Sequence, residues 1–412
     1  MGIRAETLAI GDELLVGRIS DTNSTFVSWQ MGQKGIRVLR HVVVRDDPQQ
    51  IIEGLESAIQ RCDLLLVFGG LGPTSDDITV DVVAKFLNSA VAVHDASKDK
   101  LLALYRMNQR EVTQSALRQV RYPVKSEPYF NEVGLAPAFS FEMGSCRVFC
   151  LPGVPREMKA FFQRDIQGWI DSRMSASKER TQTKTFRLMG IWESQLQTVV
   201  EKFEKSLPAN AQLGFRTIYP ENHLTLYWQS NGQDTSEFEK LGASLGELVR
   251  PWCYSDSERT LEDMIVDRLK SNGQRIAIAE SCTAGLGVHR LTRVASASEV
   301  VWGGTVVYQL AAKDILLGVK VADSESAVSA ACSLRLAEAI KLKSGCDWGA
   351  AITGWMGPSG GDTEESIGTI YIAVVGPITR QLKLKLPIRD REELQWGASS
   401  YLLFEILQAL PT

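Results

Sequence analysis

Two apolar runs in the chain are each followed by a turn of small residues and then by a helix-forming stretch. The first run, residues 63–68, leads into residues 69–79, whose sequence is Gly-Gly-Leu-Gly-Pro-Thr-Ser-Asp-Asp-Ile-Thr. The second run, residues 276–278, leads into residues 279–285, Ala-Glu-Ser-Cys-Thr-Ala-Gly. Such strand ends are where α/β proteins bind ligands, because backbone N–H groups and the helix dipole converge there. The two turns differ in chemistry, so the sequence predicts two separate small-molecule sites.

Strands and helices alternate along most of the chain, which is typical of α/β folds with a parallel sheet. The fold class that we predict is α/β, with a doubly wound N-terminal domain, a small α+β middle domain and a three-layer α/β/α C-terminal domain. The predicted segments are a first domain over residues 1–171 with a Pro- and Asn-rich loop over 122–138, a polar linker over 172–183, a connector domain over 184–250, a boundary at 251–257, and a last domain over 257–412.

Composition excludes several classes of function. The 412 residues carry 45 basic and 49 acidic side chains, a net charge of −4, which argues against nucleic-acid or membrane binding. No apolar stretch approaches the ~20 residues that a membrane helix needs, and residues 1–6 contain no signal-peptide core. The seven cysteines include no Cys-x-x-Cys pair, which favours reduced thiols. We therefore expect a cytoplasmic protein.

The first turn has the features of a phosphate site that needs a metal. Gly69, Gly70 and Gly72 let backbone amides approach a ligand, and Asp76 and Asp77 follow at the start of a helix. Adjacent carboxylates repel a phosphate unless a divalent cation lies between them. Four further polar residues follow the first strand, where they can line the same crevice: Asp12, Glu13, Asp21 and Asn23. The alternative for Asp21, Thr22 and Asp76 is helix capping.

The second turn presents a serine without a histidine partner. Ser281 lies between a strand and a helix, where its hydroxyl faces the crevice and nearby amides can form an oxyanion hole. A serine nucleophile without histidine needs another base, and a buried neutral lysine is a known alternative. Lys313, flanked by Ala311 and Ala312, is the best candidate. The alternatives are a helix N-cap for Ser281 and a solvated helix residue for Lys313.

A third turn, residues 353–362, follows another strand and is rich in glycine, as a substrate-binding loop is. Arg391 at the start of the last helix either meets a phosphate or merely solvates that helix. These motifs together resemble the competence/damage-inducible CinA family over nearly the whole chain. The matching segments are residues 11–15 with 21–23, 69–79, 151–158, 190–194, 279–285, 304–308 with Lys313, and 353–361.

The resemblance implies two activities. The first domain is similar to molybdopterin-binding proteins and to metal-dependent ADP-ribose pyrophosphatases. The last domain is similar to deamidases that convert nicotinamide mononucleotide to nicotinic acid mononucleotide and ammonia, which need no cofactor. The resemblance further implies a homodimer, and a divalent metal such as Mg²⁺ for the first domain. Rival functions are a ligand-binding or regulatory protein with an eroded deamidase site, and a molybdopterin-binding protein.

Roles carried over by position complete the prediction. The catalytic residues are Ser281 as nucleophile and Lys313 as base, assisted by Tyr308. The substrate-binding residues are Thr283, Thr353, Gly354, Gly357 and Arg391 in the last domain, and Gly69, Gly70, Gly72, Thr74, Asp21 and Asn23 in the first. The metal ligands are Asp76, Asp77, Asp12 and Glu13.

The chain departs from the family pattern at several positions of the last domain. These are residues 309–311 (Gln-Leu-Ala), Ala284, Glu365, Ser366 and the stretch of Leu394 and Gln395, where the family has a second arginine. An added carboxylate and a lost arginine each weaken binding of a phosphate-bearing substrate by about 1–3 kcal/mol when buried at the site.

Overall fold

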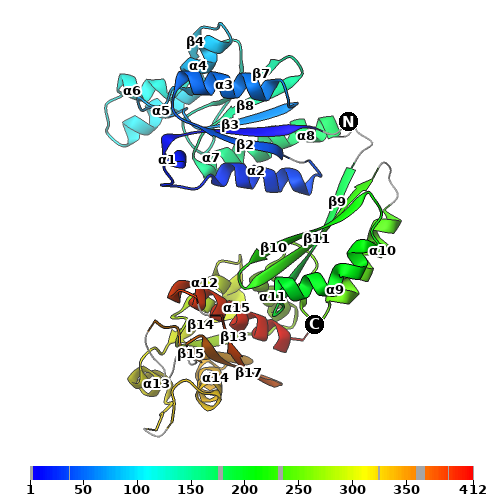
Figure 1. Ribbon diagram of the computed structural model, residues 1–412. Helices are drawn as coiled ribbons and strands as arrows, with labels where there is room; N and C mark the ends of the chain where they lie inside the picture. Colours follow the sequence, from blue (N-terminus) through cyan, green and yellow to red (C-terminus); the bar gives the residue numbers. More distant parts are fainter. Residues whose placement is uncertain are drawn as a thin grey trace. The chain divides into compact units, whose positions relative to one another are not determined.

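The computed structural model describes residues 3–36, 38–174, 180–230, 235–322, 325–358, 367–387 and 389–411. Its chain divides into two compact units, which we treat separately (Figure 1). The first comprises residues 1–183 and 227–238, and the second comprises residues 184–226 and 239–412. No helix among the described residues is long and apolar enough to cross a membrane.

A six-stranded sheet of order β2-β1-β3-β8-β7-β6 organises the first unit. Its four parallel strands pair β2 with β1, β1 with β3 and β3 with β8, whereas β7 runs antiparallel to β8 and β6 antiparallel to β7. The strands are β1 (Ala5–Ile10), β2 (Val38–Val44), β3 (Leu64–Phe68), β6 (Glu127–Tyr129), β7 (Ala138–Met143) and β8 (Cys146–Leu151).

Helices cover both faces of this sheet (Figure 1). In β3, Leu65 and Val67 belong to one apolar core, and Leu64, Leu66 and Phe68 belong to the other. A strand that is apolar on both faces must be covered on both, which explains the continuous apolar run. The α/β doubly wound prediction is therefore confirmed. The covering helices are α3 (Pro48–Ile59) and α4 (Thr79–Phe86) on one face, and α2 (Thr22–Gln33), α7 (Pro155–Phe161) and α8 (Gln167–Met174) on the other.

The predicted loop over residues 122–138 is wrong. It contains β6 and most of β5 (Arg121–Pro123), and the latter pairs with β4 (Val91–Val93). These strands are three residues long, and Pro123 and Pro128 lie within them. Proline is tolerated in strands at sheet edges, but in a sequence it usually indicates a loop. The two prolines therefore predict a loop where the structure has short strands. Further elements of the first unit are α1 (Asp12–Leu15), α5 (Asp95–Met107), α6 (Gln114–Arg118) and a π-helical turn at Phe162–Ile166.

The middle region is a four-stranded sheet of order β10-β11-β9-β12. Its strands are β9 (Arg180–Met189), β10 (Ala211–Ile218), β11 (Glu221–Ser230) and β12 (Cys253–Ser255), and its helices are α9 (Glu193–Lys205) and α10 (Ser236–Val249). The predicted linker 172–183 is shorter than expected, because α8 continues to Met174 and β9 begins at Arg180. The predicted boundary 251–257 contains β12, which pairs with β9. The division into three domains otherwise remains a prediction.

The C-terminal region is a three-layer α/β/α fold. Its five-stranded sheet has the order β14-β13-β15-β16-β17, with β13 parallel to both neighbours and β16 and β17 antiparallel. Ile276 and Ile278 of β13 face one core, and Ala277 and Ala279 face the other. The elements are β13 (Ile276–Glu280), β14 (Val301–Val306), β15 (Trp348–Gly354), β16 (Thr369–Val375), β17 (Thr379–Lys385), α11 (Leu261–Ser271), α12 (Leu286–Thr292), α13 (Leu310–Leu317), α14 (Ala330–Ser344), α15 (Arg391–Ala409) and a 3₁₀ turn at Ala297–Glu299.

Candidate functional site

Ser281 and Lys313 form a buried pair. Ser281 directly follows β13, and its backbone N–H donates to the Ile352 carbonyl (3.1 Å), which anchors it to β15. Its Oγ accepts a hydrogen bond from Lys313 Nζ at 3.1 Å. The exposed fractions are only 7% for Ser281 and 1% for Lys313. Helix α12 starts after Gly285, with no side-chain cap. The N-cap interpretation of Ser281 and the solvated-residue interpretation of Lys313 are therefore wrong.

The lysine has the environment of a neutral amine. Besides Ser281, its Nζ donates to the Val307 carbonyl at 2.6 Å, so that its partners are a hydroxyl and a carbonyl rather than a carboxylate. Burial lowers the pKa of Lys313 from its ordinary value of 10.5, because an ammonium ion loses hydration there. A neutral amine 3.1 Å from a hydroxyl can accept its proton, as a general base must.

Glu280, which precedes Ser281, is a site residue that the sequence analysis missed. Its carboxylate is 1% exposed. It accepts four hydrogen bonds, from Thr283 Oγ1 (2.5 Å) and from the backbone N–H groups of Gly285 (3.0 Å), Gly287 (3.1 Å) and Val288 (2.8 Å). The amides at the start of α12 therefore bind this carboxylate and form no oxyanion hole. In the sequence Glu280 looks like a strand residue, and only the backbone path of the turn reveals its partners.

Replacing Glu280 with glutamine should destabilise the protein by about 3 kcal/mol. The amide nitrogen of glutamine would face donors that now meet a carboxylate oxygen, and hydrogen bonds to a charged group are among the stronger ones. Urea unfolding of the Glu280→Gln variant measures this loss of unfolding free energy. The Glu338→Gln variant, which changes an exposed residue of α14, is the control. Equal unfolding free energies for the two variants would contradict this account of the turn.

The remaining predicted residues of the last domain make hydrogen bonds to groups other than Ser281 and Lys313. Arg391 at the start of α15 donates to Tyr308 Oη (2.7 Å) and to the Gly357 carbonyl (2.5 Å). Thr353 Oγ1 donates to the Ala327 carbonyl (2.9 Å), and Thr283 Oγ1 donates to the Glu280 carboxylate. Gly354 is the last residue of β15, and Gly357 lies in the stretch between β15 and β16. Residues 359–366 of that stretch, including Glu365 and Ser366, lie outside the described residues.

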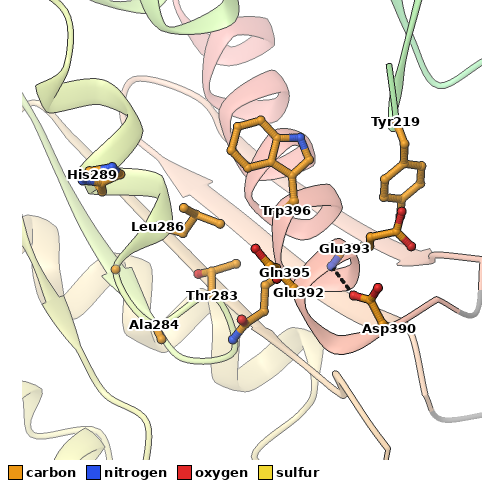
Figure 2. Close-up of a pocket in the computed structure, with 11 residues that line it drawn as sticks. Tyr219, Thr283, Ala284, Leu286, His289, Asp390, Glu392, Glu393, Gln395 and Trp396 are labelled. Atoms are coloured by element: carbon orange, nitrogen blue, oxygen red, sulfur yellow. Dashed lines mark hydrogen bonds between the residues drawn. The ribbon is translucent and has the colours of Figure 1, made fainter. Parts of the chain in front are cut away.

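A cleft of about 880 Å³ lies between the starts of α12 and α15 (Figure 2). Ser281 and Lys313 are not among its described lining residues. Ala284, at its wall, has a φ of 52°, a left-handed conformation that costs a non-glycine residue energy. The lining residues are Tyr219, Thr283, Ala284, Gly285, Leu286, His289, Asp390, Glu392, Glu393, Gln395 and Trp396.

The N-terminal unit has a pocket of about 450 Å³ at the carboxyl ends of its parallel strands. Eight predicted site residues line this pocket: Glu13, Asp21, Asn23, Gly69, Gly70, Gly72, Asp76 and Asp77. Asp12 and Thr74 are not among the described lining residues, whereas Asp46 and Glu157, which were not predicted, are. Lysine and arginine are absent from the described lining.

The tight turn itself demands glycine at two of the three predicted positions. Gly69 and Gly70 have φ values of 103° and 68°. A Cβ on Gly69 would lie 2.4 Å from the Ile10 carbonyl oxygen, and one on Gly70 would lie 2.1 Å from Thr79 Oγ1. Neither position tolerates a side chain, since such distances are below van der Waals contact.

The carboxylates of the N-terminal pocket have different partners. Asp12 pairs with Arg45 (2.9 Å), and Asp77 accepts from the Thr74 amide (2.8 Å) and hydroxyl (2.5 Å). Asp46 accepts from the Asp12 amide (3.0 Å), and burial, together with the nearby charges of Glu13, Asp12 and Asp76, raises its pKa. Within the part of the chain that the structure describes, no three acidic, histidine or cysteine side chains are grouped to hold a metal ion.

Three predicted polar residues of this pocket, Asp21, Asp76 and Asn23, have different roles. Asp21 caps α2 by accepting from the Ser24 amide (2.9 Å), so its capping alternative is confirmed. The N-cap of α4 is Ile78, without a side-chain cap, so Asp76 does not cap that helix. Asn23 is 7% exposed and donates to the Gly153 carbonyl (2.8 Å), while its Oδ1 is buried without a partner among the described atoms. An unpaired buried acceptor is costly, and a ligand donor in the pocket would satisfy it.

Comparisons with known proteins match both ends of the chain. Residues 6–171 match the family model described as a probable molybdopterin binding domain, and residues 258–410 match the CinA C-terminal domain. A CinA-like protein of Myxococcus xanthus is 34% identical over 99% of this chain and 98% of its own length. A CinA-like protein from Anaeromyxobacter sp. is 32% identical over 100% of this chain and 99% of its own length. A crystal structure of CinA from Thermoplasma acidophilum, 31% identical, covers 41% of this chain and 98% of that chain with a TM-score of 0.37. The full-length similarity to curated relatives shows that the chain belongs to the family of CinA-like proteins.

Proposed function

We propose that the last domain hydrolyses the carboxamide of a nicotinamide compound to a carboxylate and ammonia. The observation that carries this proposal is the buried contact of 3.1 Å between Ser281 Oγ and Lys313 Nζ. Nicotinamide mononucleotide is the member of this substrate class that the family resemblance implies. The rival is a regulatory protein that binds such a compound without hydrolysing it.

The geometry supports a two-step reaction. The neutral amine of Lys313 takes the Ser281 proton while Oγ attacks the carboxamide carbon. The lysine then gives that proton to the departing nitrogen, the carbon–nitrogen bond breaks, and ammonia leaves. Water, deprotonated by the same lysine, hydrolyses the resulting ester and restores the serine. The Val307 carbonyl holds Nζ in place during both steps, and no cofactor is needed.

We propose that the N-terminal domain cleaves the pyrophosphate of ADP-ribose with a divalent metal. The support is a pocket at the strand ends whose described lining has carboxylates and no cationic side chain. Mg²⁺ is often held by one or two carboxylates together with substrate phosphates, which fits a pocket without a preassembled cluster of three. Asp76 and Asp77, with Glu13 and Asp46 beside them, would hold it, and the metal would offset their repulsion of the pyrophosphate.

A second candidate for the first domain is pterin binding, which the match to the molybdopterin-binding family model favours. Thermal shifts of the full chain with ADP-ribose plus Mg²⁺, and separately with a molybdopterin precursor, distinguish the two, because a ligand stabilises only the state that binds it. Stabilisation by the pterin alone would favour this candidate over pyrophosphate hydrolysis.

Ammonia release from nicotinamide mononucleotide and nicotinamide riboside by purified full-length protein tests the first proposal. We expect release from at least one of them that is lost in Ser281→Ala. Binding without release by the wild-type protein would instead support the regulatory rival.

A further inference from the structure

Two buried cysteines of the N-terminal unit lie in direct contact, outside the sites described above. Cys62 lies two residues before β3, and Cys146 is the first residue of β8. Their Sγ atoms are 3.6 Å apart and share a hydrogen bond, although the two residues are 84 positions apart in the chain. We propose that this pair is a modification site, at which a peroxide converts the two thiols into a reversible intramolecular disulfide.

The backbone holds the two cysteines where a disulfide can form with little movement of the sheet. β3 and β8 are parallel neighbours, with Leu64 paired to Arg147. The Arg147 N–H donates to the Asp63 carbonyl at 3.0 Å. The cysteines are the residues just before this hydrogen-bonded pair, one on each side. Neighbouring strands are about 4.8 Å apart, which is within the range of roughly 4.4–6.8 Å between Cα atoms that a disulfide spans.

The hydrogen bond makes the two sulfurs chemically different. Donation from Cys146 lowers the pKa of the Cys62 thiol, because it stabilises the thiolate. The same hydrogen bond, together with burial, raises the pKa of Cys146. The thiolate is the nucleophile, so Cys62 reacts with the oxidant and Cys146 then resolves the product.

Burial restricts the oxidant to a small molecule. Cys62 is 1% exposed and Cys146 is 0% exposed. Cys62 lies in the short connection between the end of α3 and the start of β3. Local opening of such a connection costs less than unfolding of the sheet. Hydrogen peroxide is small enough to reach the sulfur through an opening of this kind, whereas a bulky disulfide is not.

The oxidation balances with one peroxide for each disulfide. The Cys62 thiolate attacks a peroxide oxygen and the O–O bond breaks. The departing hydroxide takes up the proton that Cys62 released, which gives the first water, and Cys62 is now a sulfenic acid. Sγ of Cys146 then attacks Sγ of Cys62 and the S–O bond breaks. The second hydroxide takes the Cys146 proton and leaves as water, so the two sulfurs lose two electrons and the peroxide gains two.

The cross-link would stabilise the unit without entering its pocket. The cysteines lie at the amino ends of β3 and β8, whereas the pocket lies at the carboxyl ends of these strands and is lined by Gly69 and Gly153. The disulfide would close a loop that contains β3, the glycine turn and α4. Closing a loop of this length removes conformational entropy from the unfolded chain. Oxidation should therefore stabilise this segment.

Counting thiols in the full-length protein tests the proposal. After treatment with a small excess of hydrogen peroxide, the number of thiols in the denatured chain should fall by two, from seven to five. Peptide mapping should identify a link between Cys62 and Cys146, and a reductant should restore all the thiols. A chain that keeps seven thiols, or that forms a link between other cysteines, would overturn the proposal.

Alanine variants test the order of the two steps. In Cys146→Ala, peroxide should leave Cys62 as a sulfenic acid that dimedone labels, whereas Cys62→Ala should give no label at Cys146. Cys150→Ala removes an equally buried thiol from the same strand, β8, and should still form the link. Labelling of Cys146 in place of Cys62, or loss of the link in Cys150→Ala, would contradict the assigned roles.

Hydrogen exchange measures the structural consequence. In moderate urea, amides of β3 and α4 should exchange at least about tenfold more slowly after oxidation, and a reductant should restore the original rate. Cys146→Ala treated in the same way should show no change. An unchanged exchange rate in wild-type protein that carries the link would contradict the stabilising role of the disulfide.

Discussion

Replacing either Ser281 or Lys313 with alanine is expected to lower the rate of amide hydrolysis by about 10³-fold or more. The two side chains act as one unit, because the hydroxyl attacks only after the lysine accepts its proton. The double variant should therefore lose little beyond either single variant, whereas independent contacts would multiply their effects. Ammonia release under saturating substrate measures all three rates.

The controls separate chemistry from folding. Lys320→Ala removes an exposed lysine just after α13 and should retain full activity. Lys313→Met should be inactive but should not lower the unfolding free energy by more than about 1–2 kcal/mol, since burying an amine carries its own desolvation cost. Wild-type activity in Ser281→Ala or in Lys313→Ala would contradict the proposal that these residues act as nucleophile and base.

Removing divalent metal is expected to abolish ADP-ribose hydrolysis by the N-terminal domain. The carboxylates of the pocket would then face the pyrophosphate without a counter-charge. Asp76→Asn and Asp77→Asn should each lower the rate by about 10²-fold, which is typical for the loss of one group that stabilises charge in a reaction. Phosphate analysis of the products, with and without chelator, measures both effects.

Asp77 bonds Thr74, so its variant also tests whether the turn survives the change. Asp99→Asn, an exposed residue of α5, is the matched control and should be fully active. Hydrolysis that persists in excess chelator, or in both aspartate variants, would contradict a metal-dependent site at this turn.

Regular elements and the two turns were predictable because their periodicity and small residues are local properties of the sequence. The apolar run at β3 and the turn after it were found in this way, as was the strand before Ser281. Short edge strands such as β6 were missed, since three residues with an internal proline resemble a loop. The last strand of the middle sheet, β12, was mistaken for a boundary for a similar reason.

Side chains that become neighbours only through tertiary structure were harder to predict. Asp46 lies beside the turn after β1 because β2 pairs with β1 in parallel, with Val44 opposite Ile10. This strand register cannot be predicted from the sequence. Glu280 likewise resembles a buried strand residue in the sequence. The three backbone amides that it binds lie five to eight residues ahead, where only the path of the backbone aligns them.

The central claim is that Lys313 is neutral and serves as the base for Ser281, and the pH dependence of amide hydrolysis tests it most directly. Burial lowers the lysine's pKa, so the neutral fraction grows as pH rises through that lowered value. From about pH 5 to pH 10, kcat/KM for ammonia release should rise with pH, with its inflection below the ordinary lysine value of 10.5. A kcat/KM that stays constant or falls over this range would contradict the claim.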